Sequence, residues 1–196
     1  MDGTWASVLR LLDIAAPLGG YASPGSFLDL DMLYVGTGMA ECEDRSHFSM
    51  WAMMASPLVS GNDPRSQSAA TTAILTNALV IAVDQDAAVV PARIVVESGD
   101  CRPGLVPASP CSWQAWARPL SDGSTALALL NRVGNVSTPT AINISVLFTE
   151  VDWLQPNPYE ALDLWAGGAS LGLWTGAIWV MVPSHDIVLL RLVPQL

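Results

Sequence analysis

Residues 27–63 read FLDLDMLYVGTGMAECEDRSHFSMWAMMASPLVSGND, and this stretch indicates the fold of the chain most directly. Polar and apolar residues alternate over 27–35, which is typical of a strand with one apolar face. Acidic residues then begin a helix over 40–55, whose apolar side chains recur at helical spacing until Pro57 ends it. A second short strand follows over 58–63. Strand, helix and strand in this order predict a parallel α/β architecture.

The chain on either side of this stretch has two different textures. Helical spacing of apolar residues predicts a helix over 5–12 and another over 68–77, which Asn77 ends. From about residue 89 onward, Gly, Pro and Ser turns separate short β-like runs, a pattern typical of an antiparallel sandwich. These runs lie at 92–97, 112–120, 124–133, 141–148, 161–166, 176–182 and 186–193. We therefore expect two domains, an α/β part over 1–88 and a β-sandwich over 89–196.

The composition narrows the class of partner. The 196 residues are 51% hydrophobic and 13% charged, which suits a folded globular chain. The net charge is −10. The chain has no lysine, and its 8 arginines form no cluster. Nucleic acid is therefore not expected as a partner. The two histidines lie far apart and no Cys/His spacing is present, so neither a metal site nor a cofactor is expected.

An uncharged segment at 164–185 raises the question of a membrane span. It contains no Asp, Glu, Lys or Arg, and a long uncharged apolar run is a transmembrane candidate. Four glycines interrupt the run, and cations do not flank it. Two short strands joined by glycine turns explain the segment better, and we expect no membrane partner.

Cysteines and sequons bear on the compartment. Cys101 and Cys111 flank a loop rich in Pro and Gly and are a candidate disulfide. N-x-S sequons begin at Asn135 and Asn143, which suits a secreted protein. The N-terminus has no basic start and no apolar core, so no signal peptide is visible. The compartment stays open: secreted, vacuolar or lysosomal if the full-length protein carries a signal peptide.

Several motifs in one collinear order carry a resemblance to a known family. They are R-S-H-F-S-M-W-A at 45–52, S-P-L at 56–58, N-D-P-R at 62–65 and V-I-A-V-D-Q-D at 80–86, with W-A-R-P-L-S at 116–121 and L-N-R at 130–132 in the tail. Together with D-L-D-M-L at 29–33, this order resembles the C-terminal part of the α-galactosidase (melibiase) family of retaining glycoside hydrolases. The resemblance implies the last units of a (β/α)8 TIM-type barrel followed by an antiparallel β-sandwich domain.

The resemblance also implies a substrate site at the end of the first strand. In such barrels the chemistry lies at the C-terminal ends of the strands. Asp31 and Met32 are implied as contacts to galactose, with Asp29 as a supporting residue. The family commonly has Asn before the first Asp and Pro between the two, whereas Leu28 and Leu30 stand here. These two departures put the shape of the site in question.

A retaining glycosidase needs two carboxyl groups about 5–5.5 Å apart. The family's nucleophile lies in a K-Y-D-N-like motif that this sequence does not contain, and its acid/base precedes a helix similar to the one at 5–12. We therefore expect no catalytic residue in this chain. Asp29 and Asp31 share a face of the expected strand and could converge as a catalytic pair. The resemblance favours substrate binding for both, with a purely structural role as the alternative.

The sequence leaves three hypotheses for the function of this chain. The first is hydrolysis of terminal α-linked galactose with retention, by a protein of which this chain is a part lacking both catalytic carboxylates. The second is a truncated, non-catalytic homologue that serves as a carbohydrate-binding or assembly module. The third is a membrane-anchored β protein. The expected partners are a galactoside substrate and either the missing N-terminal half of the barrel or a second copy of the chain.

Overall fold

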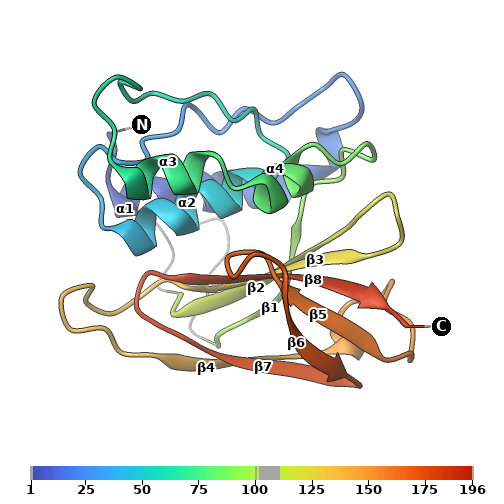
Figure 1. The fold of residues 1–196 in the computed structure, drawn as a ribbon. Helices are drawn as coiled ribbons and strands as arrows, with labels where there is room; N and C mark the ends of the chain where they lie inside the picture. Colours follow the sequence, from blue (N-terminus) through green and yellow to red (C-terminus); the bar gives the residue numbers. More distant parts are fainter. Residues whose placement is uncertain (1, 100, 102–110, 196) are drawn as a thin grey trace.

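The computed structural model describes residues 2–99, 101 and 111–195. It has three layers (Figure 1). A layer of helices and loops lies on one face of a large antiparallel sheet, and a smaller two-stranded sheet lies on the other face. The β-sandwich therefore carries a helical cover on one side.

The helical layer comes from the first half of the chain. It contains α1 (Trp5–Ala15), the 3-10 helix η1 (Ala16–Tyr21), α2 (Glu41–Met53), α3 (Ala69–Leu75) and α4 (Ala78–Asp84). Helix α2 is buried around most of its circumference, because the large sheet packs on one side of it and α3 and α4 pack on the other. A helix buried on all sides is a core element of its domain.

Helix α4 was not predicted from the sequence. The expected helix over 68–77 ends at Leu75, and Asn77 begins a new helix rather than ending the old one. The Asn77 side-chain oxygen accepts hydrogen bonds from the backbone N–H groups of Leu79 and Val80 at 3.0 and 3.3 Å. Asn is common at both kinds of helix end, so the sequence alone does not separate an N-cap from a C-cap.

The strands form two sheets in which all neighbouring strands are antiparallel. The larger sheet has the order β1-β2-β3-β8-β5-β6, and the smaller one pairs β4 with β7. Their bounds are β1 (Arg93–Glu97), β2 (Trp113–Pro119), β3 (Thr125–Asn131), β4 (Ile142–Leu147), β5 (Tyr159–Asp163), β6 (Ala169–Trp174), β7 (Ala177–Val182) and β8 (Ile187–Pro194), with η2 (Phe148–Glu150) between β4 and β5. This is the antiparallel sandwich that the sequence predicted.

The large sheet contributes to two hydrophobic cores. One face, with Trp116 and Leu189, packs against Trp51 and other residues of the helical layer. The other face, with Leu127 and Leu190, packs against the small sheet. Because side chains alternate along a strand, each central strand supplies both cores.

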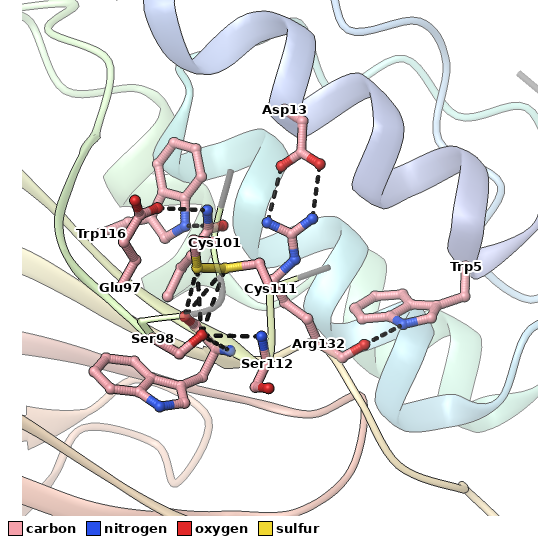
Figure 2. Close-up of polar contacts among 11 residues, drawn as sticks. Trp5, Asp13, Glu97, Ser98, Cys101, Cys111, Ser112, Trp116 and Arg132 are labelled. Carbon is pink, nitrogen blue, oxygen red and sulfur yellow. Dashed lines mark hydrogen bonds and ion pairs between the residues drawn. A yellow bond between two sulfur atoms is a disulfide. The ribbon is translucent and has the colours of Figure 1, made fainter. Parts of the chain in front are cut away.

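A bidentate ion pair joins the helical layer to the sheet (Figure 2). Both terminal nitrogens of Arg132, which follows β3, donate to the carboxylate of Asp13 on α1 at 2.8 Å. The Arg132 side chain is 1% exposed. The indole N–H of Trp5 donates to the carbonyl of Arg132 at 3.3 Å, which adds a second link between the same elements.

The regular strand expected over 27–35 does not form, and that prediction was wrong. The only ladder contact of this segment among the described residues is an isolated parallel bridge between Leu33 and Ser60. Asp31 has a φ of 75°, which no strand residue adopts. The short strand expected over 58–63 does not form either, so the two segments share only that single bridge.

The uncharged segment at 164–185 contains β6 and β7. No helix within the described residues is long and apolar enough to cross a membrane.

Candidate functional site

The three predicted site residues lie together on one loop of the helical layer. Asp29 and Met32 are exposed and Asp31 is partly exposed. Their segment runs on the side of the helices that faces away from the sheets (Figure 1). Two cavities lie in this layer, and neither of their described linings contains any of the three residues. The three residues therefore lie outside these two cavities, at the surface of the layer.

A tight turn places the two carboxylates. The backbone N–H of Asp31 donates to Oδ1 of Asp29 at 2.9 Å, and the N–H of Met32 donates to Oδ1 of Asp31 at 2.7 Å. Such side-chain contacts stabilise turns and make a left-handed Asp acceptable. The two residues are thus brought together by the turn and not by strand alternation.

Helix α2 holds this turn from below. The indole N–H of Trp51 donates to the carbonyl of Asp31 at 2.7 Å, and the Trp51 side chain is fully buried. Because Trp51 is buried near the C-terminal end of the packed helix α2, it fixes the position of the Asp31 backbone. A non-glycine residue in the left-handed region persists where its surroundings determine it, and such residues concentrate at functional sites.

A buried hydrogen bond gives the turn a second support. The backbone N–H of Leu30 donates to Oγ of Ser56 at 3.0 Å, and both residues are buried. Leu30 supplies an N–H that a proline lacks, and Ser56 supplies the oxygen that satisfies it.

The loop that follows Ser60 approaches Met32 closely. The backbone N–H of Gly61 donates to the carbonyl of Leu33 at 2.8 Å. A Cβ atom at Gly61 would lie 2.7 Å from the sulfur of Met32 and 2.9 Å from that carbonyl. Only glycine leaves room for Met32 in its present place.

The imidazole of His47, which packs against Trp51 under the turn, is neutral. Burial lowers the pKa of His47 to about 3, and neither ring nitrogen has a hydrogen-bond partner among the described residues. The His47 ring meets the Trp51 ring edge-on, with 4.1 Å between centroids. His47 is therefore a neutral packing residue under the turn, not a proton donor.

Two buried carboxyl groups border the cavities of the helical layer. Asp84 lines a cavity of about 330 Å³ together with Phe27 and Pro57, and burial raises its pKa to about 6. Asp44 lines another of about 360 Å³, and burial raises its pKa to about 6 although the N–H of Gly36 donates to it at 2.9 Å. Both groups titrate closer to neutrality than exposed carboxylates do.

The structure joins the sulfur atoms of Cys101 and Cys111 in a disulfide (Figure 2). With Glu97 these cysteines form the only group of potential metal ligands found in the described residues. Metals bind cysteine as a thiolate, and a disulfide sulfur is not one, so this group is not a metal centre as it stands.

Sequence reasoning missed the two supports of the turn. Trp51 was expected only as an apolar residue of a buried helix stripe, and Ser56 was not assigned a partner. Both lie within motifs that resemble the family, at 45–52 and 56–58. Their place within these motifs was the one sequence feature that pointed to a role. The contact between a helix and a distant turn cannot be predicted from the sequence alone.

Two family models match the chain. Residues 1–86 match the family model "Alpha galactosidase A", and residues 111–192 match "Alpha galactosidase C-terminal beta sandwich domain". The chain is 35% identical over 201 residues to α-galactosidase A of Cellvibrio japonicus, covering 98% of this chain and 46% of that protein. It is 33% identical to α-galactosidase 3 of Arabidopsis thaliana, covering all of this chain and 42% of that protein.

Solved structures agree with these matches. The α-galactosidase of Saccharomyces cerevisiae superimposes with a TM-score of 0.82 at 26% identity, over 96% of this chain and 51% of that one. α-Galactosidase I of Mortierella vinacea gives 0.79 at 30% identity, over 92% and 43%. The fold and these matches define the end of the family's catalytic domain followed by its C-terminal β-sandwich. The chain belongs to the α-galactosidase (melibiase) family, and it spans less than half the length of the curated relatives named above.

Proposed function

We propose that this chain forms the galactose-contacting wall of an enzyme that hydrolyses terminal α-linked galactose with retention. Residues 1–88 contribute the last part of its catalytic barrel, and residues 89–196 form its C-terminal sandwich. Asp31 and Met32 contact the sugar, and Asp29 supports them. The catalytic nucleophile and the acid/base are supplied by residues outside this chain.

The observation that carries this proposal is the fixed left-handed turn at Asp31. Its φ of 75° and the 2.7 Å bond from Trp51 hold a partly exposed carboxylate in one orientation, beside an exposed Met32. Carboxylates accept hydrogen bonds from sugar hydroxyls, and a methionine packs against the apolar face of a sugar ring. A site of this kind binds a neutral ring. A structure of the S. cerevisiae relative was obtained with raffinose, a galactoside, which supports the same ligand class.

Two carboxylates on one turn are a weaker basis for catalysis by this chain alone. Oδ1 of Asp29 and Oδ1 of Asp31 each accept a backbone N–H within the turn, so both are engaged in holding the loop. A nucleophile and an acid/base need to face each other across the scissile bond, about 5–5.5 Å apart. The turn instead presents its carboxylates from one side.

The test of Asp31 uses a hybrid enzyme, in which this chain is joined to the part of the Cellvibrio japonicus relative that precedes the matched region. Asp31→Asn keeps the size of the side chain but removes its charge. We expect kcat/KM on nitrophenyl α-galactoside to fall by about 10–100-fold, the value of one or two charge-assisted hydrogen bonds.

The matched control is Asp152→Asn, because the Asp152 side chain is 72% exposed and lies in the sandwich. This variant should retain the kcat/KM of the hybrid. If Asp31→Asn and Asp152→Asn behave alike, Asp31 does not contact the substrate.

A further inference from the structure

The outer face of the small sheet exposes large apolar side chains to solvent. Alternate residues of β4 and β7 point into the core, and the others point outward. The outward-facing apolar side chains are Leu147, Trp179 and Met181, which are 53%, 57% and 55% exposed and lie beside the polar Asn143 and Ser145. Large exposed apolar side chains gathered on one face are usually covered by a partner or a ligand.

The apolar face extends onto the neighbouring edge strand. The rings of Trp174 and Trp179 meet edge-on with 6.0 Å between centroids, and Leu173 on β6 is 65% exposed. The whole segment from 164 to 185 contains no Asp, Glu, Lys or Arg. No charge of this segment breaks the surface, whereas exposed edge strands normally carry such charges.

A glycosylation sequon lies in the middle of this face. Asn143 pairs with Met181 across the two strands, and Ser145 pairs with Trp179. Directly opposite and diagonal neighbours on one face of a sheet are within reach of long side chains. Asn143 is exposed, and its side chain makes no hydrogen bond to another described residue. Residues 143–145 read N-I-S, an acceptor sequence for N-linked glycans.

The disulfide is an independent indication of the compartment. Cys101 and Cys111 are joined, and disulfides persist in oxidising compartments such as the secretory pathway. N-linked glycans are added in that pathway. A second sequon at Asn135 lies in an exposed turn, where its side-chain oxygen accepts the N–H of Ser137 at 2.8 Å. That side chain is engaged in its own turn and lies outside the two strands of the small sheet.

We propose that Asn143 carries an N-linked glycan whose first sugar rings lie over Trp179 and Met181. A hexose ring has a face of C–H groups that packs against an aromatic ring, while its hydroxyls stay in water. The glycan thereby replaces an apolar surface with a hydrated one and keeps the chain soluble. This modification is independent of the sugar-cleaving function proposed above.

The attachment is a simple group transfer. Nδ2 of Asn143 forms a bond to the anomeric carbon of the first N-acetylhexosamine of a lipid-diphosphate-linked oligosaccharide. The bond between that carbon and the phosphate oxygen breaks, and the lipid diphosphate leaves with its electron pair. Nδ2 loses one proton to the transferring enzyme, and nothing is oxidised or reduced.

Peptide mass spectrometry tests the modification. The full chain is secreted from a eukaryotic host and treated with peptide N-glycosidase in heavy-oxygen water, which converts each glycosylated Asn to labelled Asp. We expect the peptide that contains Asn143 to carry the label. A peptide with unlabelled Asn143 overturns the proposal, whether or not Asn135 is labelled.

Sequon variants test whether the glycan covers the apolar face. Asn143→Gln and Ser145→Ala each remove the sequon, and Asn135→Gln is the matched control. We expect about a twofold or larger loss of monomer on size-exclusion chromatography for the first two, because an uncovered apolar patch self-associates. Adding Trp179→Ser to Asn143→Gln should restore the monomer. If the Asn143 and Ser145 variants stay as monomeric as Asn135→Gln, the glycan does not cover the face.

Discussion

At the scale of single residues, Leu30 and Ser56 show how a buried backbone donor is satisfied by a side chain far away in the sequence. Leu30 places an N–H in a buried position where the family commonly has proline, and that N–H would be costly without a partner. Ser56 places a hydroxyl 3.0 Å away that accepts this hydrogen bond. The two groups satisfy each other, so the turn at Asp31 keeps a buried support without the rigid proline.

A double-mutant cycle measures this dependence. Ser56→Ala leaves the buried N–H of Leu30 without its partner, and we expect the free energy of unfolding to fall by about 1–3 kcal/mol. In a Leu30→Pro background no N–H remains, so the same change should cost little. Urea titration of the four proteins gives the coupling energy. A coupling energy near zero would mean that the hydrogen bond contributes nothing to stability.

His47 makes stability depend on pH at the residue scale. Its side chain is fully buried without a hydrogen-bond partner among the described residues, and burial lowers its pKa to about 3. The unfolded chain binds a proton to this group at its ordinary value of 6.5, whereas the folded chain does not. Its contribution is therefore present above that value and is lost as pH falls through the window from 6.5 to about 3.

The variant His47→Leu removes this dependence. Between pH 6.5 and about 3, the native chain should lose up to about 1.4 kcal/mol per pH unit relative to the variant, because one titrating proton separates the folded and unfolded states. Denaturant unfolding of both proteins across this range measures the difference. His185 is present in both, so it cancels. Parallel stability curves for the two proteins would show that His47 does not control acid sensitivity.

At the scale of elements, the contact of α1 with the sheet depends on one buried charge. Arg132 is 1% exposed and pairs with Asp13, which is 15% exposed. A buried pair adds little net stability, but removal of one partner leaves an uncompensated charge in the interior. The attachment of α1 is thus sensitive to Asp13 in particular.

Asp13→Ala should lower the free energy of unfolding by about 3–5 kcal/mol, because Arg132 stays buried without its carboxylate. The control is Asp152→Ala, which breaks the exposed pair with Arg93 and should cost less than about 1 kcal/mol. Thermal or urea unfolding distinguishes the two. Equal losses for both variants would contradict the role given to burial.

The elements also show what the sequence could and could not predict. Alternation and turn spacing predicted most sandwich strands, and helical spacing predicted α1, α2 and α3, because these patterns are local. The pattern at 27–35 also looked like a strand, but strand formation requires partners that a local pattern does not reveal. The two short strands expected within 164–185 form as β6 and β7. The bounds of β6 were not predicted, since every one of its residues is at least partly exposed and it has no inward apolar face.

The candidate site also has a part that the sequence predicted and a part that it did not. Asp29, Asp31 and Met32 lie together because they are adjacent in the chain, so their grouping was predictable. The left-handed turn and its supports were not, because Trp51 reaches Asp31 across 20 residues and Ser56 reaches Leu30 across 26. Contacts of this separation depend on the packed fold.

At the scale of the whole molecule, helices and sandwich form one continuous structure. Helix α2 contributes to the core on one face of the large sheet, and its other side carries the turn at Asp31. The sandwich therefore serves as the base on which the proposed sugar-contacting wall rests. The exposed position of that wall is what a site completed by further residues requires.

Hydrolysis of nitrophenyl α-galactoside tests the central claim most directly, measured for the chain alone and for the hybrid with the preceding part of the Cellvibrio japonicus relative. We expect no turnover by the chain alone and turnover by the hybrid. Turnover by the chain alone, abolished by Asp31→Asn, would show that the reactive carboxylates lie within these 196 residues and would contradict this claim.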